Sequence, residues 1–265
     1  PEFDVWHGGP VDGYGAAAEK GLIEAYDSPT AKEIPDKYKD PKHYWTGVYV
    51  GVLGFCSNQK VLEEKGLQVP QSWDDLLKPE LKGQISTAHP STSGTAFTTL
   101  WTQVVLRGSE DAGLDYMKKM HANVLQYTKS GTAPGQIAGR GEVAVGLVFS
   151  HDCVKYRDEG MKDLVVSFPK EGTGYEIGGV ALVKNSKHSE AAKKYIDWAI
   201  SADAQNLGQT VGSNQILTNP NAKTNDKMAK LDEINLIDYD FAAAAAAKPE
   251  LTKRFDEEVA AKPRQ

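Results

Sequence analysis

Short apolar stretches alternate with amphipathic ones along this chain, and the alternation predicts strands and helices in turn. Strands are expected at the apolar stretches 3–9, 47–58, 83–89, 123–129, 142–150, 163–169 and 175–184. The clearest helix is expected over 186–201, SKHSEAAKKYIDWAIS, where apolar residues recur at helical spacing. Because strands and helices alternate, the pattern favours an α/β fold over a sandwich or a helical bundle.

Other helices are indicated by the residues at their ends. One is expected within residues 12–26, with Lys20 and Gly21 as its stop signal, and a second over 59–66. Six alanines at 242–247 are compatible with a helix, because alanine is the best helix former, and they indicate no function.

The composition indicates a folded chain without a large basic surface. Of the 265 residues 40% are hydrophobic, which is enough for one large domain or two lobes. The formal net charge of −6 comes from mixed charges, so nucleic acid is not expected as a partner. No apolar run approaches the roughly 18 residues of a membrane-spanning helix. The chain starts with PEFDVW instead of a signal peptide, so any secretion signal has been removed or never existed.

Two cysteines, Cys56 and Cys153, are present, and they lack the CxxC spacing of a zinc or redox site. The sequence alone is compatible with a disulfide in an exported protein and equally with two buried thiols. If joined, they would close a loop of about 100 residues, which chain entropy credits with roughly 4 to 5 kcal/mol.

Two loops repeat the sequence Ser-Gly-Thr where a predicted strand gives way to a helix. Their residues are Ser93, Gly94 and Thr95 in STSGTA, and Ser130, Gly131 and Thr132 in KSGTAP. A helix N-terminus presents unpaired N–H groups and about half a positive charge, and glycine lets a ligand approach the backbone. Each loop alone is explained by ordinary helix capping, but two on consecutive strand-helix units favour an anion site. Neither loop has the Walker pattern.

The stretch GLVFSHDCVKY, residues 146–156, ends an apolar run in four polar or reactive side chains. A hydrolase is disfavoured because Ser150 lacks the GxSxG elbow, and because Cys153 and His151 are too close in sequence for a catalytic pair. A metal site at His151 and Asp152 lacks further histidines at ligand spacing. A solvated turn and a ligand site remain, and a position at the end of a strand in an α/β sheet favours the ligand site.

Four stretches together resemble the extracytoplasmic solute-binding proteins of ABC importers. They are DVWHGGPVDGYGAAAEKGLIEAY (4–26), GVLGFCSNQKVLEEKGLQVPQSWDDLLKPELKGQIS (51–86), HPSTSGTA (89–96) and VGSNQILTNPNA (211–222). The resemblance covers nearly the whole chain and is nearest to the branch of ferric-ion, phosphonate and sugar-phosphate binders. It implies a type II periplasmic-binding fold, in which two α/β lobes joined by crossover strands close on a ligand by a hinge motion.

The resemblance also implies how the chain divides into lobes, where the protein is located and which partner it has. Lobe 1 is expected over 1–50 and 168–265, and lobe 2 over 51–167. Strand-helix units that such proteins have before DVWHGG are missing from this sequence. The family implies a periplasmic monomer that delivers its ligand to an inner-membrane ABC permease, without cofactor, resident metal or catalytic activity. Since export permits oxidation, Cys56 and Cys153 are expected to be joined.

The residues at 151 and 152 distinguish the ligand classes of this branch. Where ferric binders carry two adjacent tyrosines, this chain has His151 and Asp152, which are poor ligands for Fe(III) but suit sugar hydroxyls. Together with the two Ser-Gly-Thr loops, this implies a receptor for a hexose phosphate. An aminoalkylphosphonate, whose ammonium group would pair with Asp152, is the second hypothesis; ferric ion is the third, and a hydrolase is last.

The expected ligand-binding residues come from both lobes. They are His7, Gly8, Gly9, Ser93, Gly94, Thr95, Ser130, Gly131, Thr132, His151, Asp152 and Glu176. The two Ser-Gly-Thr loops are expected to hold phosphate, and His151, Asp152 and Glu176 to hold hydroxyl groups. A structural turn is the alternative for Gly8 and Gly9, and an ordinary strand-edge charge is the alternative for Glu176.

Overall fold

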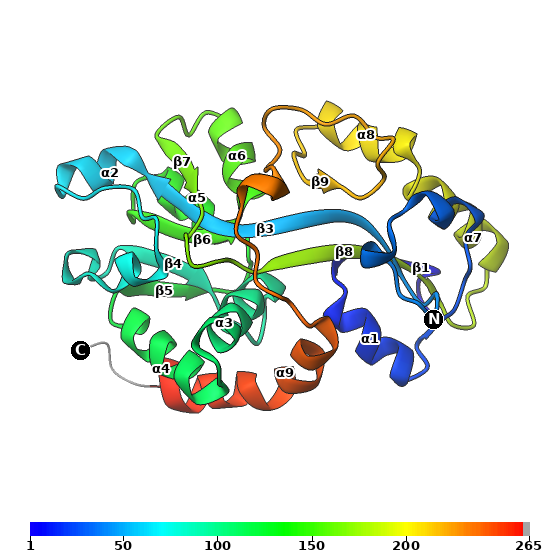
Figure 1. Ribbon diagram of the computed structural model, residues 1–265, viewed down its shortest axis with the longest axis horizontal. Helices are drawn as coiled ribbons and strands as arrows, with labels where there is room; N and C mark the ends of the chain where they lie inside the picture. Colours follow the sequence, from blue (N-terminus) through cyan, green and yellow to red (C-terminus); the bar gives the residue numbers. More distant parts are fainter. Residues whose placement is uncertain (262–265) are drawn as a thin grey trace. The chain divides into compact units, whose positions relative to one another are not determined.

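The computed structural model describes residues 1–261, which form two compact units (Figure 1). Unit 1 consists of Pro1–Gly51, Glu176–Met228 and Phe241–Ala245, and unit 2 consists of Val52–Tyr175, Ala229–Asp240 and the described residues from 246 to 261. The chain therefore passes between the units several times, and the long strand β3 (Thr46–Asn58) contributes to both.

Unit 1 is an antiparallel sheet with helices. Its strands run in the order β1-β8-β3, with β2 paired to β8 and β9 paired to β3. Besides its part of β3, its elements are β1 (Val5–Pro10), α1 (Asp12–Glu19), β2 (Ile23–Glu24), most of β8 (Tyr175–Val183), α7 (Ser189–Ala199), α8 (Ala202–Thr210), β9 (Ile216–Leu217) and the start of α9 (Phe241–Phe255).

Unit 2 is a mixed sheet in the order β3-β6-β4-β5, with β7 paired to β3. Its other elements are α2 (Gln59–Glu64), β4 (Ile85–Ala88), α3 (Gly94–Arg107), α4 (Glu110–His121), β5 (Val124–Thr128), α5 (Ala133–Gly139), β6 (Val145–Phe149), α6 (Ser150–Asp158), β7 (Leu164–Ser167) and the rest of α9. Strand β4 is parallel to both β5 and β6, so these three strands end at the same edge of the sheet.

Small residues let the helices of unit 2 pack closely. A Cβ atom added at Gly146 in β6 would lie 2.6 Å from the backbone carbon of Pro134, so α5 lies directly on the sheet. A Cβ atom at Gly113 in α4 would lie 2.8 Å from the backbone nitrogen of Val104 in α3. In Figure 1, α5 and α6 cover one side of these strands, and α3 and α4 cover the other.

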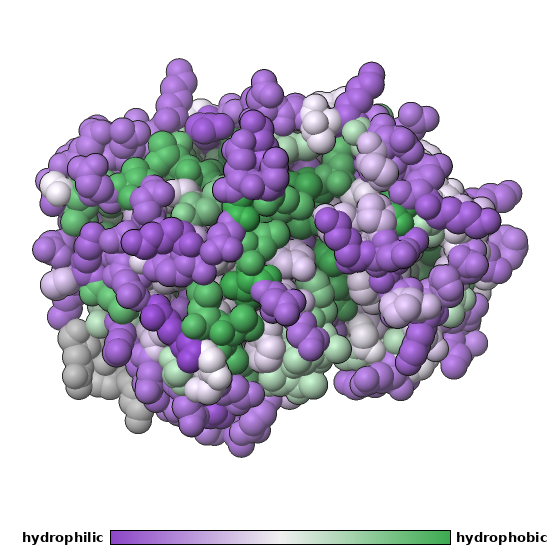
Figure 2. Space-filling view, viewed as in Figure 1, coloured by the Kyte–Doolittle hydropathy of each residue, from purple (hydrophilic) through white to green (hydrophobic). Residues whose placement is uncertain are grey.

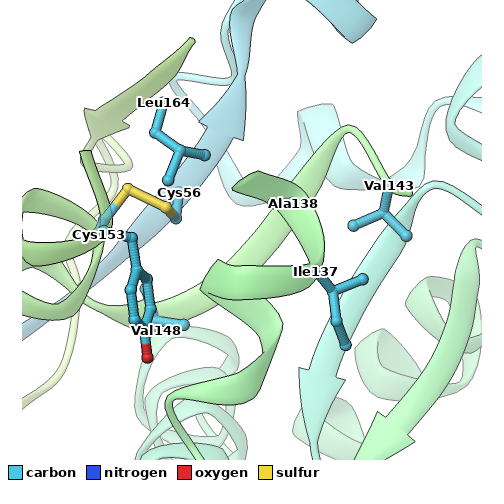
Figure 3. Packing of buried hydrophobic residues seen from close by; sticks show 8 residues of the cluster. Cys56, Ile137, Ala138, Val143, Val148, Cys153 and Leu164 are labelled. Atoms are coloured by element: carbon cyan, nitrogen blue, oxygen red, sulfur yellow. A yellow bond between two sulfur atoms is a disulfide. The ribbon is translucent and has the colours of Figure 1, made fainter. Parts of the chain in front are cut away.

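Cys56 and Cys153 form a disulfide, which confirms the prediction (Figure 3). It joins β3 to α6 across 97 positions of sequence, within unit 2. Both cysteines are buried in an apolar cluster with Val148, Ile137 and other side chains of α5 and β6. The disulfide therefore fixes α6, with His151 and Asp152 in its first turn, to the centre of the sheet.

The predicted strands and the predicted helix over 186–201 are confirmed, the latter as α7. The helix expected within 12–26 ends at Glu19, because Gly21 takes a left-handed backbone conformation with φ of +65°. The residues that follow form β2 and pair with β8 instead of continuing the helix. The stop signal at Lys20 and Gly21 therefore predicted the end of this helix correctly.

The compact units and the lobes that the resemblance implies differ in how they divide residues 168–265. The sequence assigns 168–265 to lobe 1, whereas 168–175, 229–240 and the chain from 246 group with unit 2. The physical reason near the chain's end is burial, since Phe255 is fully buried against the rings of His89 and Tyr127 in unit 2. The six alanines lie in α9, as their helix propensity predicts.

The surface on the face shown in Figure 2 is mostly hydrophilic, as expected for residues in contact with water. None of the helices described between residues 1 and 261 has the length and apolar character needed to cross a membrane.

Candidate functional site

Three polar loops of unit 2 lie at one edge of its sheet. The loops follow β4, β5 and β6, and β4 is parallel to both of the other strands. They lead into the helices α3, α5 and α6, respectively. In sheets of this kind, ligands bind outside the carboxyl ends of the strands. The topology therefore brings together eight of the twelve predicted ligand-binding residues, those of the two Ser-Gly-Thr loops and the pair His151 and Asp152.

The two Ser-Gly-Thr loops are in direct contact. A Cβ atom at Gly131 would lie 2.7 Å from Ser93 Oγ and closer still to Thr95 Oγ1, so only a hydrogen fits there. The Thr92 hydroxyl also donates a hydrogen bond to the Lys129 carbonyl, at 3.1 Å. The second loop is braced internally by a 3.0 Å hydrogen bond between the hydroxyls of Ser130 and Thr132.

The helices at this edge begin in different ways. Ser93 caps α3, accepting a hydrogen bond from the Ala96 N–H at 3.4 Å. Thr132 and Phe149, the residues before α5 and α6, make no side-chain cap, so neither side chain accepts a hydrogen bond from a first-turn N–H group of its helix. An anionic or hydroxyl-bearing ligand offers the acceptors that such groups need.

Replacing Gly131 with alanine is expected to force the loops apart. Overpacking of this kind costs about 1 to 3 kcal/mol of stability, and we expect the affinity for inorganic phosphate to fall about tenfold. Differential scanning fluorimetry and calorimetry on the variant measure both effects. Gly15→Ala is the matched control, because nothing lies within 4 Å of a Cβ atom there. Unchanged phosphate affinity in Gly131→Ala would contradict the expectation that the two loops hold phosphate together.

His151 and Asp152 lie in the first turn of α6 and are largely buried. Their side chains are 12% and 15% exposed, so the alternative of a solvated turn is wrong. Their nearest polar atoms, His151 Nε2 and Asp152 Oδ1, are 3.8 Å apart, which is too far for a hydrogen bond. Within residues 1–261 the structure gives the Asp152 carboxylate no hydrogen bond. Its acceptor capacity is therefore available to a ligand.

Burial shifts the protonation of both side chains toward the neutral form. Burial raises the pKa of Asp152 to about 6, against a smaller opposing effect of Lys155. Burial also lowers the pKa of His151 to about 4. At neutral pH the site therefore presents a carboxylate beside an uncharged imidazole, which can both accept and donate hydrogen bonds.

These two shifts have opposite effects on stability between pH 4 and 6. As pH rises from 4 to 6, Asp152 ionises in the unfolded chain before it does in the folded one, so its contribution to stability falls. His151 loses its proton at lower pH in the folded chain, so its contribution rises until about pH 6.5. The two contributions nearly cancel in the wild-type protein.

In Asp152→Asn, only His151 of this pair still makes a pH-dependent contribution to stability. Relative to wild type, the free energy of unfolding of the variant is expected to rise by about 2 to 3 kcal/mol from pH 4 to 6. His151→Gln should show a change of similar size and opposite sign. Urea denaturation at each pH measures both differences, and parallel pH profiles for the three proteins would contradict the shifts.

The other four predicted residues belong to unit 1. Gly8 and Gly9 lie in a bulge of β1 with φ of +92° and +79°, conformations that favour glycine, so the structural alternative explains their residue type. Tyr14 holds this bulge by donating to the Gly8 carbonyl at 2.8 Å. Glu176 is 5% exposed, so the alternative of an ordinary strand-edge charge is wrong.

His7 lies beside a small cavity within unit 1. Its Nδ1 is 2.8 Å from the hydroxyl of Tyr195, and the imidazole itself is exposed. The cavity has a volume of about 200 Å³, and Tyr49, Trp198 and Gln205 are among the residues that line it with His7.

Two residues that hold the loops of unit 2, His89 and Tyr156, were not predicted from the sequence. The His89 carbonyl accepts hydrogen bonds from the N–H groups of Thr92 and Ser93, both at 3.0 Å. The Tyr156 hydroxyl donates to the carbonyl of Thr132 at 3.1 Å. Two signals could have found them: His89 directly follows a predicted strand, and Tyr156 lies four positions after Asp152 on one helix face. Over the part of the chain that the structure describes, no group of three or more His, Cys, Asp or Glu side chains could hold a metal ion.

The α/β fold with ligand-competent loops at the carboxyl ends of its strands is that of a periplasmic binding protein. The chain belongs to a family of bacterial extracellular solute-binding proteins, whose model matches residues 11–245. An uncharacterized protein of Haemophilus influenzae is 41% identical over 255 residues, which cover 94% of this chain and 73% of that relative.

Two solved structures are similar over nearly the whole chain. The periplasmic binding protein AfuA from Actinobacillus pleuropneumoniae, with exogenous fructose-6-phosphate bound, has a TM-score of 0.94 and 39% identity, covering 99% of this chain and 84% of AfuA. The periplasmic binding protein P5PA has a TM-score of 0.91 and 33% identity, covering 98% and 84%.

Two more distant relatives carry other ligand names. An Fe(3+)-binding periplasmic protein of Serratia marcescens is 24% identical, over 86% of this chain and 67% of its own length. A putative 2-aminoethylphosphonate-binding periplasmic protein of Salmonella typhimurium is 27% identical, over 77% of this chain and 59% of its own length.

Proposed function

We propose that this protein is the periplasmic receptor of an ABC importer, and that it captures a hexose phosphate for delivery to an inner-membrane permease. The observation that carries the proposal is the edge of unit 2, where two touching Ser-Gly-Thr loops lie beside the buried pair His151 and Asp152. The similarity to AfuA, whose structure holds fructose-6-phosphate, supports this ligand class.

The two Ser-Gly-Thr loops suit the phosphate group. The N-terminus of α3, a helix of 14 residues, offers backbone N–H groups and the positive end of the helix dipole. The Thr95 hydroxyl lies beside Gly131 of the second loop, and the hydroxyls of Thr95, Ser130 and Thr132 can donate further hydrogen bonds. Because much of this binding comes from the backbone, we expect Thr95 and Thr132 each to contribute only a single hydroxyl bond.

His151 and Asp152 suit the sugar. A carboxylate that is buried without a hydrogen bond gains one or two strong, charge-assisted bonds when a sugar hydroxyl reaches it. The neutral imidazole of His151 can accept or donate one more. His7, Gly8, Gly9 and Glu176 belong to unit 1, and their role in ligand binding stays a prediction from the family resemblance.

A 2-aminoethylphosphonate-type ligand is the second candidate. It would use the same loops for its phosphonate group, and its ammonium group would pair with Asp152. The Salmonella typhimurium relative supports this class. Ferric ion ranks third, because His151 and Asp152 supply one hard oxygen ligand group where two phenolates serve the ferric binders.

Isothermal titration calorimetry with fructose 6-phosphate, 2-aminoethylphosphonate, inorganic phosphate and ferric citrate tests the proposal. Fructose 6-phosphate is expected to bind most tightly, and inorganic phosphate weakly. Tighter binding of the phosphonate would favour the second candidate. Binding of ferric ion alone, with a visible colour, would contradict the sugar-phosphate assignment.

The protein is expected to bind its ligand without converting it. This follows from the residues that could act as nucleophiles, since neither Ser150 nor Cys153 has the surroundings of an activated nucleophile and Cys153 is held in the disulfide. Incubation with fructose 6-phosphate and colorimetric measurement of released phosphate tests this. Release that scales with protein concentration and is lost in Asp152→Ala would contradict the expectation.

A further inference from the structure

We propose that Asp256, near the end of the chain, is a positioning residue for the phosphate loops: acting through His89, it sets the conformation of the loop that leads into α3. The inference rests on the proposed function, because it assigns a role in phosphate binding to a residue outside the ligand-binding set and distant from it in sequence. All of the contacts that support it lie within unit 2.

His89 connects the two phosphate loops through its backbone. Its N–H donates to the Thr128 carbonyl at 2.9 Å, just before the second Ser-Gly-Thr loop. Its carbonyl accepts from Thr92 and Ser93, which turn the chain into the N-terminus of α3. The Thr92 hydroxyl in turn reaches the Lys129 carbonyl. A shift of His89 therefore moves both loops together.

The His89 side chain is held on both sides. Its Nε2 lies 3.0 Å from Asp256 Oδ1, and its Nδ1 lies 2.7 Å from Ser91 Oγ and 3.3 Å from the Ser91 N–H. A carboxylate only accepts hydrogen bonds, so the proton of a neutral His89 belongs on Nε2. Nδ1 is then an acceptor, which is what the N–H of Ser91 requires and what the Ser91 hydroxyl can donate to. The Asp256 carboxylate thus selects the tautomer that holds the first loop.

The segment that carries Asp256 is anchored by contacts that do not involve the Asp256 carboxylate. Phe255 is fully buried, with its ring centroid 5.4 Å from that of His89 and 5.7 Å from that of Tyr127. Arg254 pairs with Asp111 at 2.7 Å and with Glu258 at 2.8 Å. These contacts place Asp256 against His89, so the carboxylate does not have to order the segment by itself.

The expected effect is moderate because the contact is partly exposed. The side chains of Asp256 and His89 are 51% and 22% exposed, and exposed ion pairs contribute little. Asp256→Ala should weaken both inorganic phosphate and fructose 6-phosphate by about three- to tenfold. Equal losses for both probes are expected, because the affected loops are assigned to the phosphate group and not to the sugar.

Two further variants separate positioning from general stability. Asp256→Asn keeps an oxygen acceptor for Nε2–H and should restore most of the affinity. Glu258 lies in the same segment as Asp256, and its carboxylate pairs with Arg254 and Lys118. Glu258→Gln removes this charge without changing a contact of His89. Both affinities should therefore stay within about twofold of wild type.

Calorimetry with the two probes is combined with 15N NMR of the His89 imidazole in the full-length protein. Wild type is expected to show the tautomer protonated on Nε2, and Asp256→Ala a mixture of tautomers. An unchanged His89 spectrum in Asp256→Ala, or equal loss of affinity in Glu258→Gln, would overturn the inference. If wild type binds neither probe, the proposed function fails, while the imidazole signals still decide whether Asp256 controls His89.

Discussion

Removing the disulfide between Cys56 and Cys153 is expected to lower the free energy of unfolding by about 3 to 5 kcal/mol. The bond closes a loop with a sequence separation of 97, and a loop of that size restricts the unfolded chain strongly. Both cysteines are buried among apolar side chains, so alanine at the two positions avoids leaving an unpaired hydroxyl in the core. The double variant Cys56→Ala/Cys153→Ala is therefore suited to the measurement.

Urea denaturation followed by tryptophan fluorescence measures this loss, since Trp73 and Trp101 are buried in unit 2. Wild type unfolded in the presence of a reductant serves as the control, because it lacks the bond but keeps the cysteine side chains. Agreement between the reduced wild type and the double variant would assign the loss to the bond itself. A loss below about 1 kcal/mol in both would show that the unfolded chain is already restricted.

The sequence predicts the parts of this fold that depend on local patterns. The apolar stretch before Ser150 indicates a buried strand, and the two Ser-Gly-Thr loops indicate the passage from a strand to a helix. The parallel pairing of β4 with its neighbours then follows from strand-helix-strand connections, which place successive loops at one edge. Eight candidate residues are therefore expected at one edge of the sheet in unit 2.

Contacts between distant segments could not be predicted in this way. Nothing in the local pattern around Phe255 and Asp256 indicates that they pack on His89, because such a contact depends on the path of the whole chain. Similarly, the pattern left open whether Asp152 is solvated or buried. Its burial results from α6 being held against the sheet by the disulfide one residue later, at Cys153.

Asp152→Ala is expected to weaken the binding of fructose 6-phosphate by at least about tenfold, which corresponds to a loss of roughly 1.4 kcal/mol. The buried carboxylate is assigned to sugar hydroxyls, and charge-assisted hydrogen bonds of this kind contribute roughly 1.5 to 3 kcal/mol. Inorganic phosphate has no sugar hydroxyls to bond with Asp152. Its affinity should therefore stay unchanged, or rise slightly because a nearby negative charge is gone. Calorimetry with both ligands measures the difference.

Glu159→Gln is the matched control for this variant, because it removes one negative charge from the other end of α6, where the side chain is 53% exposed. It should change neither affinity. Burial raises the pKa of Asp152, which means that the fold itself disfavours the carboxylate, so Asp152→Ala should be at least as stable as wild type at pH 7. A charge that the fold disfavours is a candidate for a ligand-binding role. Equal losses for both ligands would instead assign Asp152 to the shape of the phosphate loops, and no loss for either would remove it from the ligand-binding site.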